Sequence, residues 1–339
     1  MKILISGING FVGANLVKAF RDEYSLNGID IIPDCTEGVE KVGSWKDSDL
    51  VSDADVVIHL AGKAHDTKNT TDEQEYFDVN VGLTQRIFDH FLASGAKKFI
   101  FFSSVKAVAD TVDGDELTEE AIPAPHTPYG KSKLEAERYL LSQPVLVDKK
   151  IYILRPCMIH GPGNKGNLNL LYTMVKKGIP YPLGAFENRR SYLSIANLVF
   201  ILENLIKSDN TSYIPRPSSF VLRPPASVTR PPSSVLGPPS SVIYHLADDE
   251  PLSTNQVIEL MASSLNRPPR IWKINADLVR RLARLGDHLP LALNSERLKK
   301  LTESYVVSNK KLKHALGIDH LPVTASAGML STLQSFQKH

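Results

Sequence analysis

The sequence predicts an α/β protein with a doubly wound parallel sheet and a smaller, mostly α-helical C-terminal lobe. Two observations carry this prediction. Short apolar runs typical of buried strands alternate with segments whose apolar residues recur at helical spacing. The 339 residues, 42% of them hydrophobic, can bury a sizeable core in about two domains or in one large unit with a lobe.

Strand-like runs follow one another along the first half of the chain, with one more in the second half, and helical patterns lie between them. Strands are expected at residues 3–6, 26–30, 56–61, 99–103, 151–155 and 242–247, and helices at 11–20, 81–93 and 131–141. In a sheet of this kind, ligands bind beyond the carboxyl ends of the strands. Small or polar residues stand at those ends, in Ala61-Gly62-Lys63, Ser103-Ser104 and Arg155-Pro156.

The first strand-like run turns into the first helical segment through Gly7, Gly10 and Gly13, spaced three residues apart. Such a turn leaves backbone N–H groups and the positive end of a helix dipole facing outward, which suits a pyrophosphate. The common dinucleotide pattern G-x-G-x-x-G has a glycine where this chain has Asn9. A Rossmann-type dinucleotide site is predicted, and the alternative is a turn that only packs a helix closely on a sheet.

Asp30 ends the second apolar run, about twenty residues beyond the glycine turn. A carboxylate at this position accepts hydrogen bonds from an adenosine ribose and repels a ribose phosphate. No Arg or Lys occurs in residues 31–36 to offset that charge. The predicted cofactor is therefore NAD rather than NADP.

The composition excludes several classes of protein. The formal net charge is +2 and the basic residues are dispersed, so no nucleic-acid partner is expected. Cys35 and Cys157 cannot form a disulfide framework, no spacing offers a metal site, and His59, His65 and His126 are expected to be structural or exposed. Without a signal peptide or an apolar run of membrane-spanning length, the expected location is the cytoplasm, with no membrane partner.

Residues 216–243 are four tandem seven-residue units that contain seven of the chain's 22 prolines. Proline at this density favours extended or irregular chain. We expect an insertion that is dispensable for folding, and a proline-rich ligand for a partner protein is the alternative.

Tyr129 and Lys133 are four residues apart at the start of a predicted helix, which places them on one face. A phenol is a poor base at its ordinary pKa of about 10, but neighbouring positive charge favours the phenolate. Tyr129 is then able to take a proton from an alcohol while a hydride leaves to NAD. Tyr172 and Lys176 have the same spacing, but they lie in an apolar stretch typical of a core helix.

At this point the sequence resembles the extended short-chain dehydrogenase/reductases, and among them the NAD-dependent nucleotide-sugar epimerase/dehydratase family. The resemblance covers almost the whole chain. It rests on the stretches GINGFVG, DADVVIHLAG, DVNVGLTQ, FFSSVKAV, PYGKSKLEAE, ILRPCMIHGPG, NRRSYLSIANL and SNKKLKHALG.

The resemblance implies roles for individual residues. Tyr129 is expected to be the catalytic acid/base, with Lys133 holding the nicotinamide ribose and lowering the phenol pKa. The predicted cofactor-binding residues are Gly7, Asn9, Gly10, Phe11, Val12, Gly13, Asp30, Leu60, Ala61, Gly62, Lys63, Asn80, Ser103, Tyr129, Lys133, Pro156, Ile159 and His160. The last three are expected to close over the nicotinamide.

The chain departs from the family at Val105, where a Ser or Thr usually donates a hydrogen bond to the reacting oxygen. Two residues are candidates to replace the missing hydroxyl: Ser104, which is expected to be catalytic, and Lys106. The S-S-V-K stretch is similar to a subgroup of 4-keto-sugar reductases and epimerases of surface-polysaccharide synthesis. A sugar 4,6-dehydratase is excluded because no acidic residue stands at Lys106 or Ala107.

Substrate recognition is expected from the second half of the chain, where Arg suits a diphosphate. The predicted substrate-binding residues are Lys106, Asn167, Arg189 and Arg190, and solvated loop arginines are the alternative. The resemblance implies a nucleotide-diphosphate sugar, a UDP-sugar, as substrate and a homodimer as the assembly. Three functions remain open: a UDP-sugar 4-epimerase, a UDP-4-keto-6-deoxy-N-acetylhexosamine 4-ketoreductase, and a non-catalytic dinucleotide sensor.

The predicted NAD-binding domain covers residues 1–164, with 191–206 and 242–250 returning to it. Residues 165–190 and 251–339 are assigned to the substrate-binding lobe, and 216–243 to the insertion.

Overall fold

The computed structural model describes residues 1–34, 36–44, 49–63, 72–164, 166–208, 241–288 and 293–337. Cys35, His65, Lys165 and the proline-rich units up to residue 240 lie outside the described residues. The expectations for Cys35, for His65 and for the insertion therefore stay predictions.

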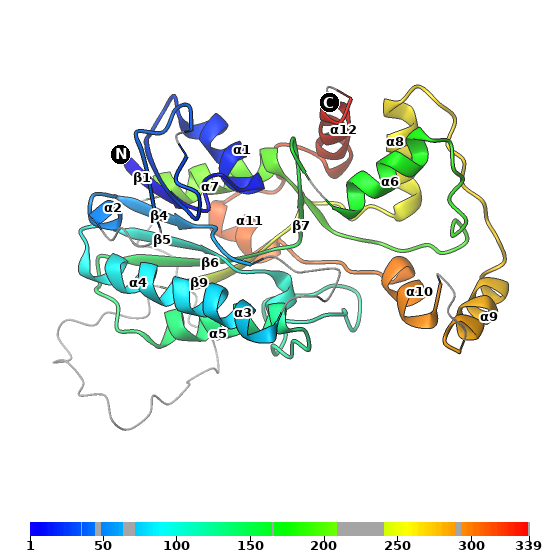
Figure 1. Ribbon diagram of the computed structural model, residues 1–339, viewed down its shortest axis with the longest axis horizontal. Coiled ribbons are helices and arrows are strands. Elements are labelled where there is room, and N and C mark those ends of the chain that lie inside the picture. Colours follow the sequence, from blue (N-terminus) through cyan, green and yellow to red (C-terminus); the bar gives the residue numbers. More distant parts are fainter. Residues whose placement is uncertain are drawn as a thin grey trace.

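A seven-stranded parallel sheet forms the centre of the larger part of the molecule (Figure 1). Its strand order is β3-β2-β1-β4-β5-β6-β9, so the chain starts in the middle, moves to one edge and then builds out toward the other. This is the doubly wound arrangement that the alternating pattern predicts. The strands are β1 (Lys2–Ser6), β2 (Ser25–Asp30), β3 (Lys41–Ser44), β4 (Val56–His59), β5 (Lys98–Phe102), β6 (Lys150–Pro156) and β9 (Ser241–Leu246).

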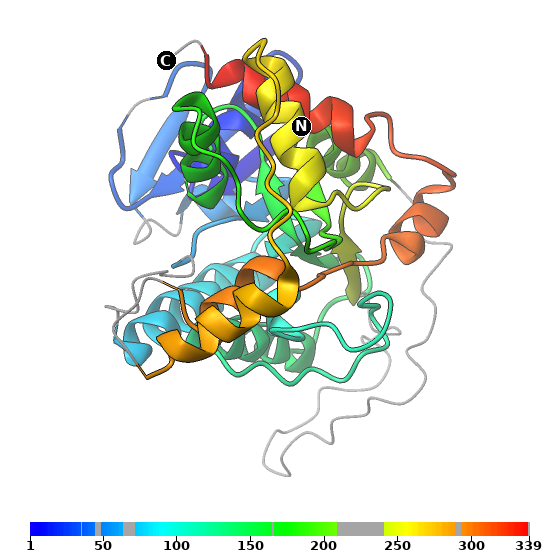
Figure 2. The ribbon, with the colours of Figure 1, turned by 90° about the vertical axis from the view of Figure 1, so that its right-hand side faces the viewer.

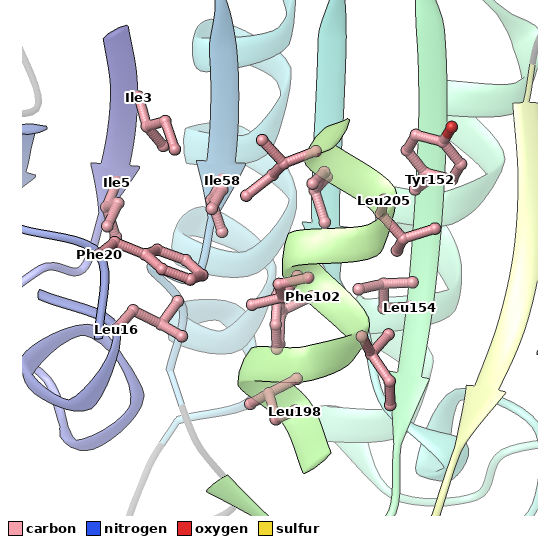
Figure 3. Close-up of a cluster of buried hydrophobic side chains, with 14 of the residues drawn as sticks. Ile3, Ile5, Leu16, Phe20, Ile58, Phe102, Tyr152, Leu154, Leu198 and Leu205 are labelled. Atoms are coloured by element: carbon pink, nitrogen blue, oxygen red, sulfur yellow. The ribbon is translucent and has the colours of Figure 1, made fainter. Parts of the chain in front are cut away.

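Helices cover both faces of this sheet (Figure 1). On one face, α1 (Phe11–Phe20) and α7 (Ile195–Lys207) pack apolar side chains onto the strands (Figure 3). On the other face, α4 (Thr84–Ala93) and α5 (Pro128–Ser142) enclose a second core that contains Phe88, Phe91 and Phe99. Both faces of each central strand are buried, which explains why the strands are continuous apolar runs in the sequence.

The smaller lobe consists mainly of helices and lies beyond the carboxyl ends of the strands (Figures 1 and 2). In Figure 2 the yellow helix α8 (Thr254–Ser264) and the red helix α12 (Ala325–Ser335) lie above the orange helices α9 (Ala276–Gly286) and α10 (Ser295–Thr302). Helix α6 (Asn167–Lys176) shares a hydrophobic cluster with α8 and α12. Helix α11 (Lys310–Leu316) instead packs Leu312 into the core of the sheet, so this part of residues 251–339 lies on the larger unit.

Several short elements complete the described chain. They are α2 (Asp49–Ser52), α3 (Glu73–Phe77), a π-helix (Asp78–Leu83), a 3-10 helix (Val105–Ala107), and the strand pair β7 (Met158–His160) and β8 (Tyr192–Ser194).

Gly13 provides a test of how tightly α1 packs on the glycine turn. A Cβ atom at Gly13 would lie 2.4 Å from the carbonyl oxygens of both Gly7 and Ile8, which are backbone atoms that cannot turn away. Gly to Ala inside a helix normally stabilises by about 1 kcal/mol. Gly13→Ala is expected instead to destabilise by about 1–3 kcal/mol, as overpacking does.

Gly82, in the π-helix, is the matched control because a Cβ there meets no atom of the chain within 4 Å. Gly82→Ala should leave the melting temperature unchanged or raise it. Calorimetric melting of both variants measures the difference, and equal melting temperatures would contradict the packing argument.

Candidate active site

The predicted catalytic residues and most of the predicted cofactor residues lie where β1, β4, β5 and β6 end, on the side of the sheet that faces the smaller lobe (Figure 1). The strand order reverses between β1 and β4. In doubly wound sheets the crevice at such a reversal is where ligands bind. The fold alone therefore brings the glycine turn, the Ala61-Gly62-Lys63 turn and the start of α5 to one edge.

The glycine turn is held against the end of β2 and against the turn after β4. Gly7 has a φ of +74°, its N–H donates to the carbonyl of Ile29 at 2.7 Å, and a Cβ there would lie 2.9 Å from the backbone nitrogen of Ala61. Gly10 caps α1 without a side-chain hydrogen bond. Among the described residues, the N–H groups of Phe11 and Val12 have no acceptor. These free donors at a helix N-terminus fit the pyrophosphate of a dinucleotide.

Asp30 lies beside this turn, at the end of β2. Its carboxylate accepts hydrogen bonds from the backbone N–H of Asn9 at 2.9 Å and of Ile31 at 2.7 Å. The side chain of Asn9 donates to the carbonyl of Ile32 and accepts from Thr36. Asn9 therefore fixes the turn to the end of β2 and the segment after it through its backbone N–H and both side-chain polar atoms, and its role as a cofactor ligand stays a prediction.

The position of Asp30 carries a prediction about cofactor choice. A fixed carboxylate beside the turn accepts hydrogen bonds from ribose hydroxyls and repels a ribose phosphate. NAD is expected to bind at least about tenfold more tightly than NADP, a difference of about 1.4 kcal/mol. Asp30→Asn should narrow that ratio, whereas Asp34→Asn, which removes a nearby exposed carboxylate, should not. Titration calorimetry with both cofactors measures the ratio, and a preference for NADP would contradict the assignment.

Helix α5 begins close to the segment that follows β5. The Thr127 hydroxyl accepts from the N–H of Gly130 at 3.2 Å and caps the helix, and Pro128 occupies its first position. A Cβ at Gly130 would lie 2.3 Å from the carbonyl oxygen of Lys106. Glycine therefore allows the first turn of α5 to approach the 3-10 helix closely enough to bring Tyr129 to Ser104.

The phenol of Tyr129 forms a hydrogen bond with the Ser104 hydroxyl, and its ring meets Tyr76 edge to face at 6.3 Å. Burial raises the pKa of Tyr129, and the Ser104 hydrogen bond opposes that rise. Lys133 is not among the groups that shift this pKa. The expectation that Lys133 and an oxidised nicotinamide together lower the phenol pKa stays a prediction.

Lys133 lies one turn further along α5, buried beneath Gly62. Its Nζ donates to the carbonyl of Phe102 at 2.9 Å and lies 5.1 Å from the centre of the Phe101 ring. A Cβ at Gly62 would lie 3.0 Å from this Nζ and 2.9 Å from the Asn80 side-chain oxygen. Burial lowers the pKa of Lys133 to about 8, against the opposing effect of Glu137. Three predicted residues from distant parts of the sequence, Gly62, Asn80 and Lys133, thus meet at one point.

Asn80 is buried in the π-helix and ties two of these segments together. Its side-chain oxygen accepts from the N–H of Lys63 at 2.7 Å, and its amide group donates to the Ser132 hydroxyl at 2.9 Å. Lys63 itself forms an ion pair with Glu75. Short π-helical segments are frequent at functional sites, and this one fixes the turn after β4 onto α5.

Ser103 is bound to a buried ion pair that lies next along α5. Its hydroxyl donates to Glu137, whose carboxylate also forms two hydrogen bonds with Arg155, at 2.9 Å and 2.5 Å. All three side chains are buried. Sequence reasoning missed Glu137, although its spacing on the face of Tyr129 and Lys133 is the signal that identifies it.

The side chains of Val105 and Lys106 pack against residues outside the cluster of Tyr129, Ser104 and Lys133. Val105 is buried in an apolar cluster with Val108, Leu117 and Val307. Lys106 donates to the carbonyl of Asp110 at 2.9 Å and lies 4.2 Å from the centre of the Tyr305 ring. Of the two candidates to replace the missing hydroxyl, Ser104 is the one whose hydrogen bond reaches Tyr129.

Of the three residues expected to close over the nicotinamide, Pro156 and His160 are buried and Ile159 is half-buried. Pro156 ends β6 and is buried, and Ile159 packs against the core of the sheet. His160 is fully buried, with Nδ1 at 2.9 Å from the Thr332 hydroxyl and Nε2 at 3.8 Å from Asp248. Direct contact of these side chains with the cofactor stays a prediction, and so does that of Leu60.

Two of the three histidines set aside in the sequence are described. His59 is buried between the Ser6 hydroxyl at 2.6 Å and the Thr84 hydroxyl at 2.9 Å, and burial lowers its pKa to about 3. His126 is exposed beside Asp110.

Tyr172 and Lys176, the second tyrosine–lysine pair with this spacing, lie in a different environment. Tyr172 is buried between α6, α8 and α12, meets the ring of Phe336 edge to face at 5.3 Å, and its hydroxyl has no partner among the described residues. Lys176 is exposed at the end of α6. This pair belongs to the core of the lobe.

Of the four predicted substrate residues, Lys106 lies in the 3-10 helix after β5, and the other three fall within residues 165–190. Asn167 starts α6 and is exposed, and Arg189 is exposed as well. Arg190 donates to the carbonyls of Lys300 and, at 3.3 Å, of Glu303, so its guanidinium group caps the end of α10.

A pocket of about 470 Å³ opens beside that end of α10. Arg280, Arg284 and Lys299 line it, together with Ala185, Phe186, Glu187, Ala276, Ser295, Leu298 and Thr302. Sequence reasoning missed its cations because they come from two helices that only the tertiary fold brings together. Tyr129, Lys133 and Ser104 are not among its lining residues.

Two further properties bear on the site. Within the described ranges, no three His, Cys, Asp or Glu side chains are placed to hold a metal ion. None of the helices in those same ranges has the length and apolar character needed to cross a bilayer.

Comparison with known proteins places these features in context. A family model for the NAD dependent epimerase/dehydratase family matches residues 3–213. A UDP-glucose 4-epimerase of Vibrio cholerae is 35% identical over 216 residues, which are 60% of this chain and 66% of that protein. An N-acetyl-alpha-D-glucosaminyl-diphospho-ditrans,octacis-undecaprenol 4-epimerase of Escherichia coli O157:H7 is 25% identical over 78% of this chain and 72% of its own length. The matches thus span about two thirds of the length of these relatives.

Solved structures match the fold over the whole chain. MoeE5 in complex with UDP-glucuronic acid and NAD superposes with a TM-score of 0.72 at 19% identity, covering 100% of this chain and 99% of that one. A UDP-galactose 4-epimerase gives a TM-score of 0.68 at 17% identity, with the same coverage. The predicted doubly wound fold is confirmed.

Proposed function

The chain belongs to the NAD dependent epimerase/dehydratase family, and from this premise we propose that it is a UDP-sugar 4-epimerase. It is an enzyme of an NAD-dependent family, and one of its relatives is a UDP-glucose 4-epimerase at 35% identity. The observation that carries the proposal is the cluster of Tyr129, Ser104 and Lys133 at the carboxyl ends of the strands, next to the glycine turn.

The site would hold NAD, whose oxidised form would supply both the acceptor for the hydride of sugar C4 and a positive charge that favours the Tyr129 phenolate. Tyr129 accepts the proton of the C4 hydroxyl as the hydride leaves, and returns it when the hydride comes back. Ser104, already hydrogen-bonded to the phenol, donates to the sugar oxygen in place of the hydroxyl that Val105 lacks. Lys133 lies beneath Gly62 and Asn80, a place from which its ammonium group reaches a ribose.

An epimerase must hold the diphosphate while the keto sugar turns, so that hydride returns to the opposite face. We assign this anchoring to cationic side chains of the smaller lobe, and so keep residues 165–190 and most of 251–339 as the substrate lobe. Arg280, Arg284 and Lys299 line one pocket, and Arg189, two residues after the pocket-lining Glu187, is exposed. Arginine forks match phosphate oxygens bidentately, which supports this assignment. A homodimer is kept as part of the proposal.

A 4-ketoreductase uses the same proton transfer but needs hydride on one face only and an exchangeable reduced cofactor. Val105, as part of the S-S-V-K stretch, favours this second candidate.

One experiment separates the two. The purified enzyme is incubated with UDP-glucose and with UDP-N-acetylglucosamine without added cofactor, and separately with a UDP-4-keto-6-deoxy sugar and NADH or NADPH. Interconversion of C4 epimers in the first reactions supports the epimerase. Consumption of reduced cofactor in the second reaction, without interconversion in the first, would support the 4-ketoreductase instead of the epimerase. Inactivity in both, with NAD demonstrably bound, would overturn the substrate class.

A further inference from the structure

Helix α9 lies at the outer end of the smaller lobe (Figure 1), and it carries a row of exposed leucines. Leu278, Leu282 and Leu285 recur at positions i, i+4 and i+7, and each is about half exposed, at 51%, 49% and 54%. Val279 and Ala283, on the adjoining face, are buried against α10. The helix is therefore apolar on two faces, and only one of them is covered by the protein.

The same part of the chain is strongly basic. Residues 267–302 contain nine Lys and Arg side chains and three Asp and Glu side chains, whereas the whole chain has 39 and 37. Arg281 is exposed on α9 beside the leucine row, whereas the neighbouring Arg280 forms an ion pair with Asp277. Positive charge and exposed apolar surface thus coincide on one helix.

We propose that the leucine row of α9, defined by Leu278, Leu282 and Leu285, docks on the surface of an anionic phospholipid membrane. Amphipathic helices with leucines on one face and arginines on the other lie in the plane of a bilayer, apolar face inward. Basic side chains at the edge of such a face bind anionic headgroups, with a strength that falls as salt rises. The sequence-based expectation of no membrane partner rests on the lack of a spanning segment, which a surface helix does not need.

A second copy of the chain fits this face less well. A two-fold contact between leucine rows brings the same patch of each copy together, so that Arg281 faces the arginines of its partner. Like charges beside an apolar contact oppose association, whereas an anionic surface complements them.

The test is flotation of the full-length enzyme with vesicles of neutral phosphatidylcholine, with and without about one third phosphatidylglycerol. Binding is expected with the anionic vesicles alone, and it should be released by high salt. Leu282→Glu combined with Leu285→Glu should reduce binding at least tenfold, and Arg281→Glu should reduce it several-fold. Val147→Glu, at an exposed apolar residue in the loop before β6, is the matched control and should bind as the parent does.

Each remaining outcome decides against the proposal. Failure of the parent enzyme to float with anionic vesicles overturns it. So does a leucine variant that keeps its vesicle binding, or one whose main change is a smaller assembly mass, because the face then joins copies of the chain. Turnover of a soluble UDP-sugar should be unchanged in all variants, which separates this result from any failure of the proposed activity. Leu282→Ser replaces the double variant if circular dichroism shows that the latter does not fold.

Discussion

Replacing Tyr129 by Phe is expected to lower kcat about a thousandfold while the affinity for NAD stays nearly unchanged, because positioned acid–base groups contribute about 10²–10⁴ in rate. Phenylalanine keeps the ring contact with Tyr76 and removes only the hydroxyl that meets Ser104. Steady-state turnover and a cofactor titration measure the two quantities.

Tyr172→Phe is the matched control for this prediction. Tyr172 precedes a lysine by the same four residues, but its hydroxyl has no partner in the described part of the chain and lies in the core of the lobe. Its turnover should remain close to that of the parent enzyme. If both variants lost activity to the same degree, the assignment of Tyr129 as the acid–base residue would be wrong.

Glu137→Ala is expected to destabilise the enzyme by about 3–5 kcal/mol, which is the cost of leaving a buried charge unpaired. The side chains of Glu137 and Arg155 are 1% and 4% exposed, so removing the carboxylate leaves the guanidinium group buried without its partner. For a protein of this size the melting temperature should fall by on the order of 10 °C in a calorimetric scan.

Glu135 supplies the comparison on the same helix. It also pairs with an arginine, Arg138 at 3.4 Å, but both side chains are about half exposed. An exposed pair at this spacing contributes about 0.3–0.5 kcal/mol, so Glu135→Ala should melt close to the parent enzyme. Equal melting temperatures for the two variants would show that the buried pair adds nothing beyond an exposed one.

The sequence was sufficient for the parts of the fold that depend on local patterns. The continuous apolar runs at β1, β4, β5 and β6 are strands because helices bury both of their faces, and the glycines at residues 7, 10 and 13 form the turn onto α1. By contrast, β3 has the sequence KVGS at the edge of the sheet, where one side has no partner strand among the described residues. A short, polar edge strand has no periodic signal to detect.

The site also contains residues that local spacing predicts and contacts that depend on tertiary packing. The spacing of Tyr129 and Lys133 is local, so the helix places both on one face. The ion pair of Glu137 and Arg155 depends on β6 lying next to α5, and the cap that Arg190 places on α10 joins residues more than a hundred positions apart. Contacts of that kind follow from tertiary packing, which no local pattern encodes.

The place of β9 in the sheet also has a consequence for how the protein is made. Strand β6 ends at Pro156, but its neighbour β9 begins only at Ser241. At a synthesis rate of about 5–20 residues per second, the ribosome needs roughly 4–17 s to deliver β9 after β6. During that time the growing chain carries an unpaired edge of an apolar parallel strand, which is a template for pairing with other chains. Chaperone dependence of the nascent enzyme should therefore be greatest in the interval between residue 156 and residue 246.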